Sequence, residues 1–248
     1  MQTEAVSSDT LVRDALLIAL TVSTGAVDAI SWLGLGKVFS AFMTGNLVFL
    51  GFLVGGVAGP PIGRVVAGLA AFAVGAVLAG RFVRATQGDG EIWPRRVTFA
   101  LAVCMLAQGA FLGVWASVGG HPSNGVSVLL IATMAFAMGV QTAAVFSLGV
   151  RGVFTTAATA TLAVLMGDLS GWSQSRGERF RLLAVIVGLV TGAAIGAAIF
   201  VRAPSWAPLF PFDVTALVVL LSQQFFGRAA PAVRLAAHDS RVAPLGMP

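Results

Sequence analysis

The sequence predicts an all-α protein that crosses a membrane several times. Hydrophobic residues make up 57% of the 248 residues and charged residues only 10%, whereas about 25% of residues are charged in an ordinary soluble domain. The charged residues also cluster between long neutral runs. Residues 97–150 carry no full charge, and this run is long enough for two spans of about 20 residues each. Its only polar break, GGHPSNG (119–125), has the composition of a tight turn between helices.

The placement of the charged residues argues against a nucleic-acid partner, and the single cysteine excludes two kinds of cysteine chemistry. The formal net charge is +5, but the arginines lie at the ends of apolar runs, where they orient spans in a membrane. We therefore expect the lipid bilayer, and no nucleic acid, as a partner. Cys104 is the only cysteine, so an internal disulfide or a cysteine-based metal cluster is excluded. The sequence has no P-loop or dinucleotide fingerprint, and no cofactor or metal is expected.

Neutral runs between charged residues divide the chain into eight apolar segments. The sixth has only 16 residues between Arg151 and Asp168, which is short for a bilayer crossing. A basic tail rich in alanine and proline follows over 228–248, and we expect it in the cytoplasm. The eight segments cover approximately residues 15–36, 38–60, 64–83, 97–118, 126–150, 152–169, 181–201 and 206–226.

The chain also repeats itself, which predicts a single membrane domain over 1–248 built from two repeats at about 11–119 and 125–226. Each matched block is weak alone in so apolar a chain, but all four occur in the same order at a nearly constant offset. The matched blocks are TGAVDAISW (24–32) with MGVQTAAVF (138–146), VFSAFMTGNLVFL (38–50) with VFTTAATATLAVL (153–165), RVVAGLAAFAVGA (64–76) with RLLAVIVGLVTGA (181–193), and PRRVTFAL (94–101) with PFDVTALV (211–218).

The basic residues favour one topology for these segments. If the second segment of each repeat enters the membrane and returns on the same side, each repeat crosses three times and the repeats are inverted. Most basic residues then lie in the cytoplasm with both termini, and only Lys37, Arg64 and Arg202 lie outside, as the positive-inside rule requires. The prediction is about six transmembrane helices plus two re-entrant or broken segments. The alternative, eight helices in two parallel four-helix repeats, would divide the basic residues almost evenly.

A polar tip inside the second apolar segment is the first candidate for a functional site. Thr44, Gly45 and Asn46 interrupt this segment, and a break at membrane depth exposes backbone groups that lipid cannot satisfy. Gly45 permits unusual backbone angles, while Thr44 and Asn46 offer side-chain partners to the freed groups. The matching positions of the second repeat are Thr159 and Thr161. Paired interrupted segments in inverted repeats are typical of a transport site near the midplane; the alternative is a close helix-packing face.

The same stretch carries a family resemblance. GAVDAISWLGLGKVFSAFMTGNLVFLG (25–51) resembles the signature of the YoaK-like family of bacterial inner-membrane proteins, a family of unknown function, in its Gly-x-x-Asp-Ala and Met-Thr-Gly-Asn-Leu motifs. In the second half, Gly139 and Gln141 match a Gly-x-Gln-Asn pattern, but Thr142 replaces the Asn. Ala160 likewise replaces the Gly of a Thr-Gly-Thr-Leu pattern. The resemblance implies a bacterial inner-membrane protein of about six helices and brings no established substrate.

Asp28 is the strongest single candidate for a functional residue, because it lies near the middle of the first span, where a charge is costly. It belongs to a small, polar stripe at helical spacing that must face protein or a cavity. We predict that Asp28 couples transport to an ion, a proton in preference to sodium, and the alternative is an interhelical hydrogen bond. The other members of the stripe are Thr21, Thr24, Gly25 and Ser31.

These features predict a transporter or channel for a small polar solute, with no catalytic residues. A non-transporting scaffold or accessory subunit is the alternative. An intramembrane enzyme is a remote one, because a serine nucleophile needs a nearby base and the two histidines, His121 and His238, lie in a turn and in the tail. The residues predicted to line the path are Thr44, Gly45, Asn46, Gln141, Thr142, Thr159 and Thr161.

Overall fold

The computed structural model describes residues 7–84, 91–150, 153, 155–156, 158–167 and 176–227, and this part of the chain is helical without any strand. Six of its helices are long and apolar enough to cross a membrane, and two are short and apolar. The predicted all-α polytopic membrane fold is therefore confirmed. The elements are α1 (Ser8–Gly34), α2 (Met43–Val54), α3 (Ile62–Arg84), α4 (Arg95–Ser117), α5 (Asn124–Ser147), α6 (Ala158–Gly167), α7 (Arg176–Arg202), the 3-10 turn η2 (Pro204–Trp206) and α8 (Leu209–Phe226).

Helix α1 begins earlier than the apolar run because polar residues cap it. Ser7 is the N-cap and its hydroxyl accepts the Thr10 N–H at 3.3 Å, with Asp9 in the first turn. These are favourable partners for the free amides and the positive end of a helix dipole. The helix therefore starts at Ser8 rather than at the first residue of the predicted segment, 15–36.

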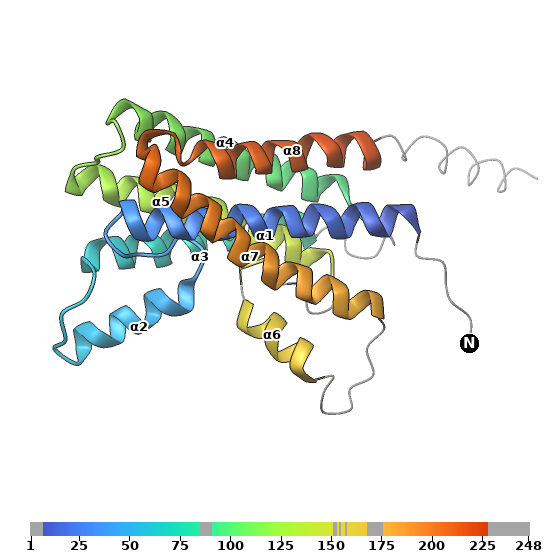
Figure 1. The fold of residues 1–248 in the computed structure, drawn as a ribbon, viewed down its shortest axis with the longest axis horizontal. Helices are drawn as coiled ribbons and strands as arrows, with labels where there is room; N and C mark the ends of the chain where they lie inside the picture. Colours follow the sequence, from blue (N-terminus) through green and yellow to red (C-terminus); the bar gives the residue numbers. More distant parts are fainter. Residues whose placement is uncertain are drawn as a thin grey trace, which may run out of the picture.

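The chain turns back into the molecule directly after α1. Gly36 and Lys37 both adopt the left-handed region, with φ of 82° and 60°, which reverses the chain direction within a few residues. Residues 38–42 then return towards the middle of the bundle without forming a helix, and α2 leads outward again (Figure 1). The second segment thus enters and leaves at one end of the bundle, as predicted for a re-entrant segment.

The two short helices lie together on one side of the bundle. Figure 1 shows α2 and α6 below α1 and α7, with their first residues towards the middle and their last residues towards opposite ends. Helix α2 packs on α3, and α6 packs on α7. The positive, N-terminal ends of both helices therefore approach the same central region.

The main contacts between long helices come in equivalent pairs. If α1 is matched with α5, α3 with α7 and α4 with α8, each of these contacts has a counterpart made by the matching helices. Helix α1 packs on α7 and α5 packs on α3; likewise α1 packs on α8 and α5 packs on α4. With three long helices in each half, matching helices run in opposite directions. The division into two repeats stays a prediction, but the helices are arranged as inverted repeats require.

Glycines permit the closest approach at both main crossings. A Cβ atom on Gly192 of α7 would overlap the carbonyl oxygen of Val22 on α1, and one on Gly25 would overlap that of Leu189. At the other crossing, Gly75 of α3 meets the Phe136 carbonyl in the same way, and Gly139 of α5 meets that of Phe72. Small residues allow membrane helices to approach backbone to backbone. These four glycines are two of the matched pairs in the sequence repeat, Gly25 with Gly139 and Gly75 with Gly192.

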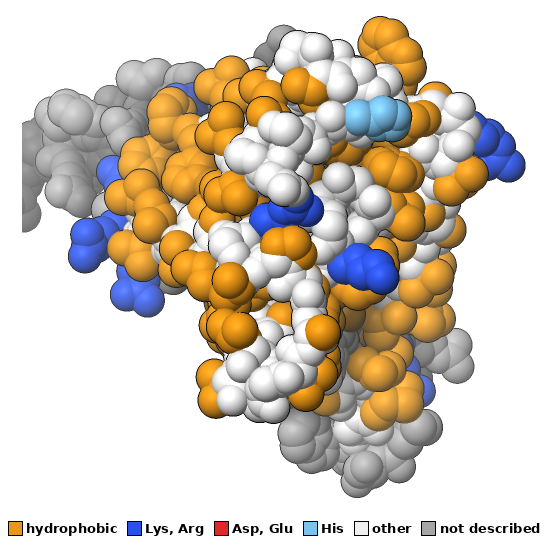
Figure 2. Space-filling model, turned by 90° about the vertical axis from the view of Figure 1, so that its left-hand side faces the viewer, with side chains coloured by type: hydrophobic (Ala, Val, Ile, Leu, Met, Phe, Trp, Pro, Cys, Tyr) orange, Lys and Arg blue, Asp and Glu red, His pale blue; other side chains and the backbone are white. Residues whose placement is uncertain are grey.

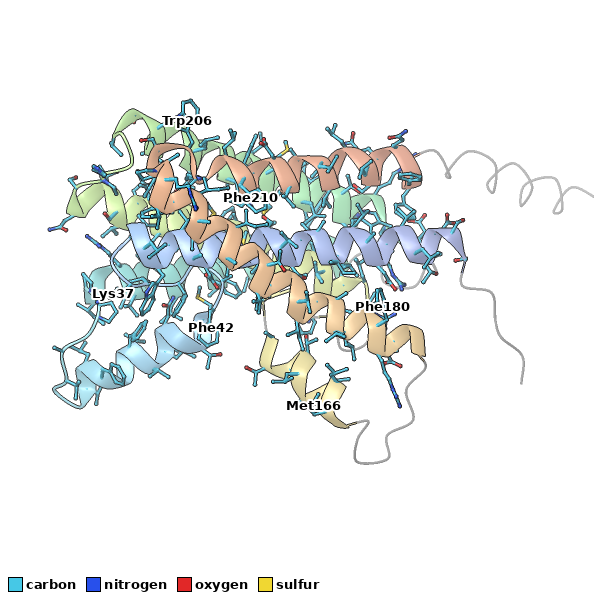
Figure 3. The ribbon with its side chains drawn as sticks, in the orientation of Figure 1. Lys37, Phe42, Met166, Phe180, Trp206 and Phe210 are labelled. Carbon is cyan, nitrogen blue, oxygen red and sulfur yellow. The ribbon has the colours of Figure 1, made fainter. Side chains whose placement is uncertain are left out.

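The outer surface of the helices is apolar. Phe180, Trp206 and Met166 are 73%, 65% and 45% exposed, and Figure 3 shows Trp206 and Met166 at the outer margin of the bundle, on η2 and α6. Such a surface on membrane-length helices is in contact with the lipid bilayer. Most of the buried apolar side chains belong to α1, α4 and α5.

Basic side chains are concentrated at the end of the bundle where α1 begins. There Arg181 binds Asp14 at 3.3 Å, Arg96 donates to the Phe82 carbonyl at 3.0 Å, and Arg95 donates to the Gly227 carbonyl at 2.7 Å. At the opposite end, Arg64 of α3 donates hydrogen bonds to the Leu35 carbonyl, just after α1, and to the side-chain oxygen of Asn124 on α5. Figure 2 looks onto that opposite end, where basic side chains are few among hydrophobic ones.

Labelling single cysteines should show on which side of the membrane each end lies. In a Cys104→Ala background, we expect His121→Cys to react with a membrane-impermeant maleimide added to intact cells, and Glu91→Cys to react only after permeabilisation. Both positions are exposed, and they lie at opposite ends of α4. This expectation follows from the positive-inside rule, by which an arginine-rich end faces the cytoplasm. Labelling of Glu91→Cys in intact cells would contradict this topology.

Candidate functional site

Asp28 of α1 binds the inner end of the re-entrant segment by hydrogen bonds. Its Oδ1 accepts the backbone N–H groups of Ser40 at 2.9 Å and Ala41 at 2.8 Å, and its Oδ2 accepts that of Phe42 at 2.9 Å. Phe42 is the N-cap residue of α2 and has no side-chain cap of its own. The first amides of a helix need acceptors, and the carboxylate accepts the amide of this N-cap residue together with those of the two residues before it.

Asn46 secures the same segment from the other side. Its Oδ1 accepts the Phe39 N–H at 3.1 Å, and its Nδ2 donates to the Phe39 carbonyl at 2.7 Å. Asn46 is fully buried, so both ends of its amide are occupied by the backbone of one residue. Ser31 adds a third fastening, because its hydroxyl lies 2.7 Å from that of Ser40. Asp28 and Asn46 thus satisfy backbone groups that the break in the helix leaves free.

Gly45 has a different role from the one its sequence position suggests. It lies in the first turn of α2 and its φ is not positive, so the predicted unusual backbone angle is absent. A Cβ atom at this position would lie 2.8 Å from the Phe42 ring and 2.9 Å from the Phe39 ring. Gly45 therefore makes room for the two aromatic side chains that precede the helix.

A cavity of about 660 Å³ lies where the two short helices begin. Helices α1 and α7 form one part of its wall, and the first residues of α2 and α6 form the rest. Figure 3 shows Phe42 at the inner end of α2, on the side towards α6. The residues that line the cavity are Thr24, Gly25, Asp28, Ala29, Trp32, Leu33, Phe39, Phe42, Thr44, Thr156, Ala158, Thr159, Leu189, Ala193 and Ala197.

The wall is mainly apolar, with a few polar groups. Trp32 stacks on Phe39 with ring centroids 4.9 Å apart, and Phe39 meets Phe42 edge to face at 5.1 Å. Asp28 and four threonines supply the polar groups. Within the described residues, no three His, Cys, Asp or Glu side chains come together as metal ligands would.

The structure brings three of the predicted site residues onto this wall: Asp28, Thr44 and Thr159. Gly45 and Asn46 lie behind it, in the support of the re-entrant segment. Gln141 also lies one layer back, because its Nε2 donates to the Thr24 hydroxyl at 2.8 Å and it is fully buried. Gly45, Asn46 and Gln141 therefore do not line this cavity, and their place along a transport path stays a prediction.

Thr142 and Thr161 also lie off the cavity wall. The Thr142 hydroxyl is 3.0 Å from that of Thr156, a wall residue, and it donates to the Met138 carbonyl. Thr142 occupies the place of Asp28 in the second repeat, so a neutral hydroxyl replaces the carboxylate. Thr161 matches Asn46 and is fully buried, and its hydroxyl has no hydrogen-bond partner among the described residues. Neither residue lines this cavity, and the path-lining role of both stays a prediction.

The α7 part of the wall was not predicted from the sequence. Leu189, Ala193 and Ala197 follow each other at intervals of four and so share one face of the helix. Their spacing shows that they share a face of the helix. It does not show that this face lines a cavity, because apolar residues in a membrane span can face either lipid or a cavity. Thr156, on the α6 side, was also missed.

Replacing Asn46 by alanine should destabilise the re-entrant segment. The change leaves the Phe39 N–H and C=O without partners, and each buried unpaired group costs about 1–3 kcal/mol. We expect a clear fall in the melting temperature of the detergent-purified protein. Leu47→Ala is the matched control, because Leu47 is the next residue and is 56% exposed. An unchanged melting temperature for Asn46→Ala would show that the amide does not support the segment.

Known proteins resemble the chain across this site. Residues 16–221 match the model of a family described as "Protein of unknown function (DUF1275)". The chain is also similar to UPF0700 transmembrane protein YoaK of Bacillus subtilis (strain 168), with 36% identity over 159 residues, which are 64% of this chain and 68% of that protein. No solved structure matches the chain significantly. The region matched by the family model includes every residue of the cavity wall.

Proposed function

The chain belongs to the DUF1275 family of proteins of unknown function, and we propose that it is a transporter or channel for a small polar solute. The cavity at the inner ends of α2 and α6 is the observation that carries this proposal. Its volume of about 660 Å³ falls in the range of about 300–1,000 Å³ that is typical of small-molecule sites. A mostly apolar wall with a few placed polar groups is also typical of such sites.

The position of the cavity favours transport over a scaffold role. Two helices that begin in the middle of a membrane bundle, one from each half, are characteristic of secondary transporters. A charge at this depth costs several kcal/mol, and ionisable residues inside membrane spans commonly mark ion or substrate pathways. We place the protein in the bacterial inner membrane with both termini in the cytoplasm, in keeping with the arginine-rich end of the bundle.

Asp28 is the residue through which we propose that transport is coupled to an ion gradient. It lies on the cavity wall and bonds to the segment that begins α2. A change in what the carboxylate binds would therefore act directly on the end of a helix. The second repeat has Thr142 in this place, so any such coupling acts through one half only.

Filling the cavity should stop the flux. We expect purified protein in liposomes to pass at least one solute from a panel of urea, glycerol, glycine and choline faster than empty liposomes do, as measured by stopped-flow light scattering. Ala197→Phe, on the cavity wall, should reduce this flux at least about tenfold, since a 1.4 kcal/mol barrier suffices for that. Ala198→Phe is the matched control, because Ala198 is exposed on the outer face of the same helix.

Two results would contradict the proposal. If no solute of the panel crosses faster than in empty liposomes, the protein does not act as a transporter of small polar solutes. If Ala197→Phe and Ala198→Phe reduce the flux equally, the path does not run through this cavity.

A further inference from the structure

We propose that the cavity binds a small organic cation, a quaternary ammonium or protonated amine, whose charge pairs with the carboxylate of Asp28. The inference rests on the proposed function, because it names the class of solute that the same cavity would take. It starts from the charge of the wall. Among the described residues that line the cavity, Asp28 is the only charged one. An anion would meet a like charge there, whereas a cation would meet its counter-ion.

The carboxylate has room for one more partner. Its two oxygens offer about four acceptor positions. Oδ1 accepts two backbone N–H groups and Oδ2 accepts one, so one position on Oδ2 is not filled by the described residues. The three donors hold the carboxylate in place without neutralising it by a basic side chain. A protonated amine in the cavity can donate to the remaining position, whereas a quaternary ammonium group, which has no N–H, can pair with the same oxygen by charge alone.

The aromatic side chains suit the rest of such a solute. Trp32, Phe39 and Phe42 all line the cavity, and Phe39 contacts the rings of the other two. Cations are attracted to the faces of aromatic rings, and quaternary ammonium groups are commonly bound in this way. Their outer surface is also apolar, so they match a wall made of rings, alanines and leucines. A strongly hydrated inorganic ion or a sugar would leave most of this wall without a suitable contact.

The test compares a cation with a neutral molecule of the same shape. Choline and 3,3-dimethylbutan-1-ol differ in having nitrogen or carbon at the quaternary centre. We expect choline to raise the melting temperature of the detergent-purified protein saturably, with a Kd at least tenfold lower than that of the alcohol, and tetramethylammonium to raise it also. Sodium chloride at equal ionic strength is the control. A ligand that binds the folded state raises its stability by mass action.

Two variants separate charge from ring contacts. Asp28→Asn should remove the preference for choline over the alcohol. Phe42→Leu keeps the carboxylate and should weaken choline binding several-fold, so the proposal can be tested even if Asp28→Asn folds poorly. Equal affinity for choline and the alcohol in the wild-type protein, or no saturable shift with either cation, would overturn the inference.

The outcome for this inference is separable from that for transport. Flux of urea or glycerol without a choline-dependent shift would refute the cation site and leave the transporter. A choline-dependent shift without flux of any solute in the panel would keep the cation site and refute the transporter.

Discussion

Replacing Gly192 by alanine should prevent α7 from packing correctly on α1. The added Cβ atom would overlap the backbone carbonyl of Val22 and lie 2.7 Å from its carbon atom. A backbone group in a helix cannot move aside as the end of a side chain can, so the two helices must separate. Overpacking of this kind costs about 1–3 kcal/mol or more. The expected result is a large fall in the melting temperature and in the yield of monodisperse protein.

The control for this variant should respond in the opposite direction. Gly113 lies on α4, is exposed, and has no atom within 4 Å of the Cβ position. Alanine is the better helix former by about 0.8–1.0 kcal/mol, so Gly113→Ala should leave stability unchanged or raise it. Gly75→Ala, at the corresponding crossing of α3 and α5, should be as harmful as Gly192→Ala. If Gly192→Ala melts like Gly113→Ala, the close crossing of α1 and α7 is not present.

The number and kind of helices could be predicted because the signal is simple. A bilayer requires about 20 apolar residues for a crossing, and the neutral runs between charges display that length directly. The second segment could be assigned as re-entrant because its polar tip has no place in a lipid-facing helix. The helix ends were predicted less well: α1 begins at Ser8 because Ser7 caps it, and the eighth segment begins with the turn η2 before α8.

The candidate site was predicted only in part, for physical reasons that individual residues show. Asp28 could be identified because a charge at membrane depth must have partners. The partners themselves are backbone amides of residues 40–42, and the sequence does not show where free backbone groups lie. Asn46 was assigned to the path because its amide could bind a solute, but the Phe39 backbone occupies both of its ends.

Replacing Asp28 by asparagine should abolish gradient-driven accumulation of solute. The change removes the charge, and an amide nitrogen in place of Oδ2 would face the Phe42 N–H donor instead of accepting from it. The loss of a hydrogen bond to a charged group costs about 1.5–3 kcal/mol, so the start of α2 should also be less stable. The measurement is uptake into proteoliposomes, with an imposed pH gradient or sodium gradient, of a neutral solute that the wild-type protein passes, because choline would also lose its proposed counter-ion in this variant. Wild-type protein should accumulate this solute with one of the two gradients.

The matched control separates coupling from support of the helix. Thr142→Val changes the corresponding position on α5 and removes the hydroxyl that lies 3.0 Å from that of Thr156, but it changes no charge. We expect this variant to lose some stability and to keep its response to the gradient, whereas Asp28→Asn should retain at most passive exchange. If Asp28 served only to cap α2, its variant would lose uptake in proportion to its folded fraction and would still respond to the gradient. The coupling role would be contradicted if wild-type flux did not change with either gradient, or if Asp28→Asn accumulated solute normally.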